Sequence, residues 1–488
     1  MFLPQDIKQG VNRIFTFRDY MFFDNQNEGK MIKDMTRGDA LRLIVLFAIP
    51  IFIGNVFQQF YQLADIYIVG HLIGEKALAA VGASAPIYFM FLIVAFSFTG
   101  GLTAVTAQRF GAKDFEGMRR SVTHSIRASL VLSVVLTLVL FVVLKRLMMV
   151  LNVPEGIFEE SYRFILILGA GTILIVALNL LSGFIRAAGD SRTPLFFLVF
   201  TSVLNVVFNF VLIKYCGFGV EGSAFGTVLS ILVSDVLCLW YMFKKFPLFR
   251  LKKGDWAFSW AFMREHLNIA VPMSIQYSIL ALSIMVIQAV CNSFGEKVIV
   301  GFTIALRFEQ LATQPLMAIG LAMATFAAQN FGAGLICRIK RTVKKTVLLS
   351  LGLSVFLSVL VFFLGPKLIG SFMEVPNSDS VRIGAAYLNI SIMFYFFLGI
   401  IFIFKNTLQS VGKPFYPVIS GVVELGVRSF AAIILARHIG YEGIYWASPL
   451  AWLSGAMVVA LGYYLNFYYK KDTIIADYKA QYQARKAA

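Results

Sequence analysis

Long apolar runs alternate with short charged turns along nearly the whole chain. Each run is long enough to cross a bilayer, because about 20 apolar residues span the hydrocarbon core as a helix. We therefore predict about twelve membrane-spanning helices. The expected helices cover residues 41–70, 77–109, 117–146, 161–188, 193–215, 220–244, 265–292, 297–331, 338–364, 382–411, 415–439 and 443–469.

Composition agrees with this pattern. Of 488 residues, 59% are hydrophobic and 14% are charged, and the mean hydropathy is +0.78. A soluble protein has about 25% charged residues, so we predict an all-α polytopic membrane protein. The four cysteines lie in or beside apolar runs without a CxxC pair, which indicates neither a disulfide framework nor a metal site.

The net charge of +17 comes from Lys and Arg in short loops, so it indicates membrane topology rather than nucleic-acid binding. Alternate loops carry basic clusters, and most of the remaining loops carry one or two basic residues. The clusters lie within residues 109–127, 244–264, 338–345 and 470–486. The positive-inside rule then predicts a plasma-membrane protein, in the inner membrane of a bacterium, with both termini in the cytoplasm.

Residues 1–30 contain charged positions and no continuous apolar core, so they do not resemble a signal peptide. We expect either a short cytoplasmic arm or an over-long start, with Met31 in place of Met1 as the initiator.

The sequence repeats itself. The segment AQRFGAKDFEGMRR (107–120) matches AQNFGAGLICRIKR (328–341), and four further pairs of short segments match at offsets of 221–223 residues. This predicts two pseudo-symmetric six-helix bundles in parallel repeat around a central cavity, a layout of alternating-access transporters. The expected parts are an arm (1–40), an N-lobe (41–244), a linker (245–264), a C-lobe (265–469) and a cytoplasmic tail (470–488).

Asp65 is an acidic residue in the first predicted helix. A carboxylate at the bilayer centre costs roughly 2.5–3.5 kcal/mol on insertion scales, and no basic residue lies within a turn or two of it. It is surrounded by amides and by Tyr61, which can hydrogen-bond a carboxylate. We therefore hypothesise that Asp65 lies in a wet, polar cavity and couples transport to an ion gradient. It can carry a proton only if it is largely dry in at least one state.

A second polar group lies in the fourth to sixth helices. Asn205 and Asn209 are spaced i, i+4 and share a helix face, and Asn179, Ser182 and Thr227 lie in the neighbouring helices. Two interpretations remain open: hydrogen bonds that join helices, or oxygens that surround Asp65 in a proton-linked network or a small-cation site.

Six other ionisable residues inside the expected helices are candidates for a role in the membrane: Asp235, Arg307, Glu309, Lys405, Glu424 and Arg428. Glu424 and Arg428 are spaced i, i+4, so we expect them to neutralise each other. Arg307 and Glu309 are two apart and point to different faces, so either could face the cavity. Asp235 is expected to reach water near the cytoplasmic end of its helix.

Several segments of the chain resemble the multidrug and toxic compound extrusion (MATE) family, in its DinF-like or MepA-like branch. The likeness rests on AIPxxxGNxFQQxYQLADIYIVG (48–70), GEKALAAVGASAPI (74–87) and RFEQLATQPLMAIG (307–320), and it covers about residues 35–470. It implies twelve helices in two bundles and export of lipophilic, often cationic drug-like compounds by antiport with protons or sodium. It implies no enzyme activity, no cofactor and no nucleic-acid partner, and we expect a monomer in the lipid bilayer.

The resemblance also implies site residues. Asp65 would be the coupling acid, with Asn205, Asn209 and Thr227 around it, and a sodium ion at Asp65 would be the only metal. The family often has Asp where this chain has Asn209, which weakens the sodium case. Pro50 would be a hinge in the first helix. Expected cavity residues are Gln58, Tyr61, Gln62, Asn179, Gln276, Tyr277, Arg307 and Glu309.

Acids typical of the NorM branch are missing from the second half of this chain. Glu309 is therefore the main candidate for a coupling acid in that half.

Alternative functions differ in their expected features. A lipid-linked saccharide flippase of the same superfamily would have more spans and a strongly cationic cavity, and an exporter of an endogenous metabolite is a related possibility. A major-facilitator transporter would carry a different motif at 107–120. An intramembrane enzyme would need a motif such as HExxH, GxSxG or a P-loop, and none occurs.

Overall fold

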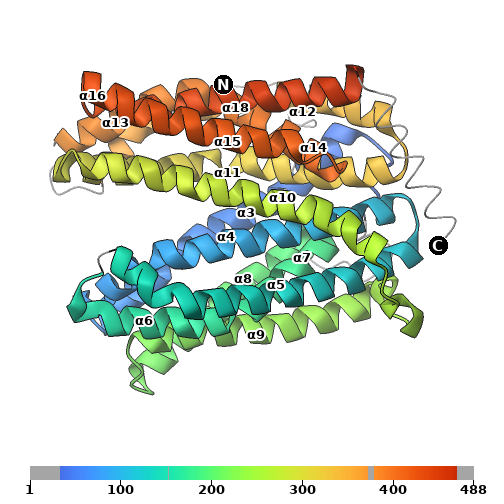
Figure 1. Cartoon of the computed structure of the whole chain (residues 1–488), viewed down its shortest axis with the longest axis horizontal. Coiled ribbons are helices and arrows are strands. Elements are labelled where there is room, and N and C mark those ends of the chain that lie inside the picture. The colour runs from blue at the N-terminus through green and yellow to red at the C-terminus, as the bar shows by residue number, and fades with distance from the viewer. Residues whose placement is uncertain (1–32, 152, 372–378, 470–488) are drawn as a thin grey trace, which may run out of the picture. The chain divides into compact units, whose positions relative to one another are not determined.

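The computed structural model describes residues 33–151, 153–371 and 379–469 (Figure 1). The chain divides into two units, Met1–Lys33 and Asp34–Ala488, and only Lys33 of the first unit is described. Every helix of the described chain belongs to the second unit. The predicted arm up to residue 32, the choice between Met1 and Met31, and the tail from residue 470 lie outside the described residues, and the other domain boundaries stay predictions.

The first half of the second unit is helical. Its helices are α3 (Ala40–Leu72), α4 (Glu75–Gly111), α5 (Phe115–Val150), α6 (Glu155–Ala170), α7 (Thr172–Ala187), α8 (Arg192–Lys214) and α9 (Val220–Lys245). Two short 3-10 helices come next, in the linker: η1 (Pro247–Phe249) and η2 (Lys253–Trp256).

The second half is also helical. Its elements are α10 (Trp260–Asn292), α11 (Glu296–Gly332), α12 (Ile336–Ser371), α13 (Asp379–Ser391), η3 (Ile392–Phe394), α14 (Tyr395–Ser410), α15 (Phe415–Phe430), η4 (Ala431–Leu435), α16 (Ala436–Ile439), α17 (Glu442–Tyr445), α18 (Ala447–Tyr464) and η5 (Leu465–Tyr469). Here η3 is a 3-10 helix, and η4 and η5 are π-helical turns.

Eleven helices of the described chain are long and apolar enough to span a membrane. They become twelve if α6 and α7, which meet at Gly171 with a bend of 46°, form one span. No strand occurs among the residues described. The predicted fold class, an all-helical polytopic membrane protein, is confirmed.

Local chemistry explains where several helices begin. The side chains of Asp39 and Asp114 accept hydrogen bonds from the backbone amides of Arg42 and Gly117, both at 2.8 Å, and so satisfy free N–H groups in the first turns of α3 and α5. Ser259 caps α10 in the same way.

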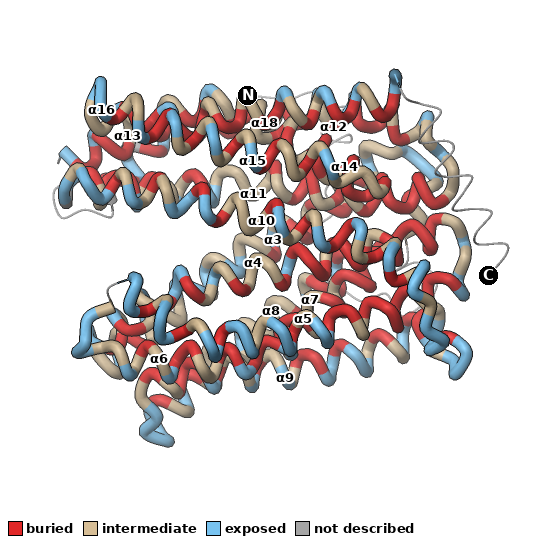
Figure 2. The backbone as a smooth tube through the Cα atoms, viewed as in Figure 1, coloured by how far each residue is buried: buried red, intermediate tan, exposed pale blue. Residues whose placement is uncertain are grey.

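The two halves contact each other mainly through four helices. Helices α3 and α4 of the first half pack against α10 and α11 of the second. Asn55 of α3 donates a hydrogen bond to Gln314 of α11 at 2.9 Å. The buried residues of α3 run from Ile44 to Gly54, and beyond them only Val69 is buried (Figure 2). The halves therefore meet on the part of α3 that precedes Asp65.

We call the end with the α4–α5, α9–α10 and α11–α12 turns the basic end, because it carries the Lys and Arg clusters. Two equivalent hydrogen bonds join the halves there. Gln108 donates to the carbonyl of Ser410 at 2.7 Å, and Gln329 donates to the carbonyl of Ala187 at 2.8 Å. Both pairs come from the repeated segments, so the sequence repeat is also a structural pseudo-symmetry.

Candidate ion-coupling site

Asp65 lies in a polar network that joins α3, α8 and α9. Its Oδ1 atom accepts hydrogen bonds from the amide of Asn209 and, at 3.0 Å, from the hydroxyl of Ser223. Asn209 also donates to Asn205 at 3.1 Å, and Asn205 donates to Thr227 at 2.9 Å. The structure thus brings together Asp65, Asn205, Asn209 and Thr227, the four residues predicted as one site.

Close packing of α8 and α9 holds Asn209 in place. Gly226 of α9 lies so near that an added Cβ would be 2.0 Å from Asn209 Oδ1. That oxygen has no hydrogen-bond partner within the described chain. The site therefore combines a carboxylate, two donors that stabilise its charge, and a buried amide oxygen that is free to accept.

Gln58, Tyr61 and Gln62 lie on the less buried part of α3. Gln58 and Gln62 are exposed, and Asp65 itself is half-buried. Tyr61 lies beside Asp65 and Thr227. Helix α3 runs unbroken through Pro50 in this structure, so its role as a hinge stays a prediction.

Asn179 does not join the network, since it donates to the carbonyl of Ile175 on its own helix at 3.0 Å. Ser223, by contrast, was not predicted. Its spacing of four residues from Thr227 places both on one face of α9 and was the signal that could have identified it.

The acid predicted for the second half is buried within it. Glu309 is 8% exposed and accepts a hydrogen bond from the hydroxyl of Tyr387 at 2.8 Å. Arg307 is exposed. The two side chains point to different faces of α11, as their spacing predicts.

Of two expectations about charged residues, that for Asp235 is wrong, whereas the charges of Glu424 and Arg428 attract each other without forming an ion pair in the described chain. Glu424 and Arg428 form no ion pair among the residues described; instead Ser420 donates to Glu424 at 2.8 Å and Arg428 donates to Ser283 at 2.6 Å. Each charge has a nearer partner on its own helix or on α10. Asp235 does not reach water: it is 8% exposed, and neither carboxylate oxygen has a hydrogen-bond partner in the described structure.

Gln276 and Tyr277 of α10 line cavities in the region where the halves meet. A cavity between the halves encloses about 740 Å³ of empty space, partly continuous with solvent, and Tyr277 and Arg186 are among its lining residues. A smaller cavity within the second half, with about 280 Å³ of empty space that includes open solvent, is lined by both Gln276 and Tyr277. Arg186, which the sequence analysis did not single out, thus faces the space between the halves.

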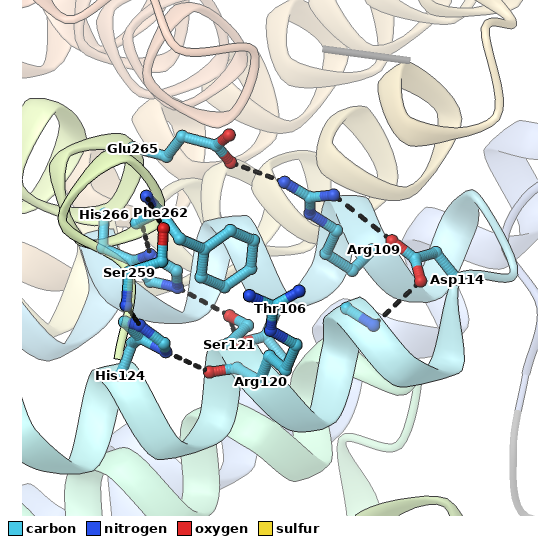
Figure 3. A network of polar contacts seen from close by, with 11 residues as sticks. Thr106, Arg109, Asp114, Arg120, Ser121, His124, Ser259, Phe262, Glu265 and His266 are labelled. Carbon is cyan, nitrogen blue, oxygen red and sulfur yellow. Dashed lines mark hydrogen bonds and ion pairs between the residues drawn. The ribbon is translucent and has the colours of Figure 1, made fainter. Parts of the chain in front are cut away.

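Histidines far apart in the sequence meet at the basic end (Figure 3). The rings of His124 on α5 and His266 on α10 stack at 6.2 Å. Ser121 and His266 Nε2 are hydrogen-bonded at 2.7 Å, and the backbone amide of Ser259 donates to His124 Nε2 at 3.1 Å. Arg109 completes this contact with ion pairs to Asp114 at 3.2 Å and to Glu265, across the two halves, at 2.7 Å. These residues join the two halves rather than form part of the Asp65 site.

Comparison with known proteins gives consistent results. The MatE family model matches residues 50–211 and 272–434. The probable multidrug resistance protein YpnP of Bacillus subtilis is 27% identical over 88% of this chain and 96% of its own length.

Two solved structures share the fold. An outward-facing multidrug resistance MATE family transporter of the MOP superfamily superposes with a TM-score of 0.82 at 23% identity, over 92% of this chain and 98% of its own. A MOP superfamily transporter from Pyrococcus furiosus, described as having a binding pocket of reverse polarity that suggests a different function, also gives 0.82 at 23% identity, over 89% and 97%.

Proposed function

Because this chain belongs to the MatE family of multidrug transporters, we propose that it exports drug-like compounds by antiport, with Asp65 as the coupling acid. The observation that carries the proposal is the Asp65 carboxylate on a membrane-spanning helix. Asn209 and Ser223 hold it by hydrogen bonds, and it has no ion-pair partner in the described chain. A carboxylate inside a membrane costs free energy, so such residues are rare and mark functional sites.

Protons are the coupling ion that this arrangement favours. Two donors already stabilise the charged form of Asp65 without a bound cation. When the carboxylate takes a proton, it accepts these bonds less strongly, because hydrogen bonds to charged groups are the stronger ones. Protonation would then loosen α3 from α8 and α9, which links the charge of Asp65 to the packing of the helices.

Sodium is the second candidate. Asn209 Oδ1 is buried without a hydrogen-bond partner in the part of the chain described, and oxygen atoms of amides and carboxylates suit hard cations. A sodium ion would need this oxygen together with Asp65. Imposing proton and sodium gradients separately would distinguish the two ions.

Alternating access is supported by the position of the contacts between the halves. The positive-inside rule assigns the basic end to the cytoplasm of a bacterial inner membrane. Gln108 and Gln329 join the halves at this end, while the α3 segment around Asp65 is less buried. We therefore interpret this conformation as closed to the cytoplasm, with Asp65 accessible from the outside.

Dye efflux from energised cells of a drug-sensitive host tests the proposal. We expect Asp65→Asn to reduce efflux of rhodamine dyes to the level of cells without the transporter, because an amide cannot bind and release the coupling ion. Asp235→Asn makes the same change at another intramembrane acid and should retain efflux. Both proteins must be present in the membrane in equal amount, and full efflux by Asp65→Asn would reject the proposal.

A further inference from the structure

The cavity between the halves and the smaller cavity within the second half are together lined by more cations than anions. Arg186 lines the cavity between the halves, and Lys405 and Arg428 line the smaller cavity beside it. The one carboxylate among the lining residues of both cavities is Glu424. Tyr277 lines both cavities, so the two spaces adjoin at this side chain.

Lys405 is a buried cation without an anionic partner. It is 5% exposed, and no carboxylate lies within ion-pair distance of it in the described structure. Its Nζ atom instead lies over the rings of Tyr277 and Phe402, at 5.0 and 5.6 Å from their centroids. A ring face compensates part of the lost hydration of an ammonium, but less than an anion does.

Arg428 has unused donor capacity in the same cavity. It is 4% exposed, and one of its terminal nitrogens donates to Ser283 at 2.6 Å. Its Nε atom is buried and has no hydrogen-bond partner among described residues. Guanidinium groups bind carboxylates and phosphates through two parallel N–H groups, so a free Nε–H is a suitable donor for an oxyanion.

Arg186 adds a third cation on the side of the first half. It is half-buried on α7, and the described structure gives it neither a hydrogen bond nor an ion pair. Around it the cavity wall is largely apolar, with Phe96, Met273 and Leu321 among its side chains. A few charged groups on an apolar wall are typical of a site for an organic ligand with one ionised group.

We propose that the transported substrate carries a carboxylate on an apolar or aromatic body, and that Lys405 and Arg428 bind this carboxylate while Arg186 lies along its path. This inference rests on the proposed function, since it names the substrate class of the same transporter. The apolar wall would hold the body of the substrate, and the buried Lys405 would gain the anionic partner that the described protein does not supply. A substrate with a cationic group as well as the carboxylate would fit, and a purely cationic one would meet an unfavourable charge.

A pair of dyes that differ in one carboxylate tests the proposal. Tetramethylrhodamine has a free carboxylate, and its methyl ester has the same ring system without that charge. Binding of both dyes to the purified protein in detergent is measured by fluorescence anisotropy. We expect the wild-type protein to bind the acid about tenfold more tightly than the ester, as for a hydrogen bond to a charged group.

Substitutions then assign the preference to Lys405. We expect Lys405→Met to weaken binding of the acid about tenfold and to leave binding of the ester nearly unchanged, whereas Lys405→Arg should keep the preference. Lys244→Met is the matched control, because Lys244 also lies over a ring, that of Trp240 at 4.6 Å, but is exposed at the end of α9.

The outcomes separate this inference from the proposed function. Equal binding of the two dyes, tighter binding of the ester, or no binding of the acid by the wild-type protein would contradict a carboxylate site, even if Asp65-dependent efflux is observed. A preference for the acid that disappears in Lys405→Met supports the site, even if Asp65→Asn retains efflux and the coupling proposal fails. If Lys405→Met does not fold, the ratio of the wild-type affinities for the acid and the ester alone tests the carboxylate site.

Discussion

Two carboxylates on membrane-spanning helices differ in their surroundings. Asp65 is half-buried, accepts hydrogen bonds from Asn209 and Ser223, and has exposed neighbours. Glu309 is buried and is held by Tyr387. Neither acid lines the two cavities described above, but Asp65 is the less enclosed of the two. We therefore assign Glu309 to the stability of the second half.

Removing the donor to Glu309 tests that assignment. We expect Tyr387→Phe to lower the free energy of unfolding by about 1–3 kcal/mol, because it leaves a buried acceptor without its partner, and to leave dye efflux unchanged. Thermal unfolding of the purified protein measures the first effect. Tyr441→Phe is the control, since the described structure gives the Tyr441 hydroxyl no hydrogen bond. Loss of efflux in a stable Tyr387→Phe protein would show that Glu309 takes part in transport.

At the scale of elements, the basic end is closed by a close approach of α4 and α11. A Cβ on Gly111 would lie 1.9 Å from the carbonyl oxygen of Gln329, and one on Gly332 would lie 1.8 Å from that of Gln108. Only glycine allows the backbones to come this near. The same two glutamines form the equivalent hydrogen bonds to the opposite halves.

We expect Gly111→Ala to separate the halves at the basic end, because the closed packing leaves no space for the methyl group. Spin labels at Glu116 and Cys337, both exposed at this end, measure the separation by double electron–electron resonance, with the exposed Cys216 replaced by Ser. The label distances should shift to longer values. Gly82→Ala is the control, because its Cβ would meet nothing within 4 Å. An unchanged distance distribution in Gly111→Ala would contradict this description of the closed end.

The helices were easier to predict than their irregularities. Apolar runs indicated nearly every span, because crossing a bilayer requires a long uncharged segment. The expected helix at 161–188 begins six residues earlier, at Glu155, because the acidic residues of its first turns interrupt the apolar run. At the bend next to Gly171, an added Cβ would lie 2.6 Å from Val228, a tertiary contact that no local pattern reveals. Helix α3 continues through Pro50, as the expected helix 41–70 does.

At the scale of the whole molecule, the duplicated halves share their contacts but differ in their chemistry. The repeated segments predicted the two bundles, and the Gln108 and Gln329 hydrogen bonds obey the repeat. The charged groups do not obey it. Asp65 belongs to the first half, and Lys405 belongs to the second.

Asn205, Asn209 and Thr227 were expected around Asp65 because the chain resembles the MATE family; from the residues alone, this network was one of two open interpretations. The positions of the cavity cations were not predicted. Arg186, Lys405 and Arg428 lie on α7, α14 and α15, and only the tertiary structure shows that they line adjoining spaces.

The central claim is that Asp65 couples transport to a proton gradient. Measuring proton movement tests this claim most directly. Purified protein is reconstituted into vesicles that contain a pH-sensitive dye in sodium-free buffer, and the compound best exported by cells is added outside. Inward movement of this compound should drive protons out, so we predict that the internal pH rises with the wild-type protein and stays constant with Asp65→Asn. An equal rise with Asp65→Asn, or a wild-type rise that requires sodium, would contradict the account.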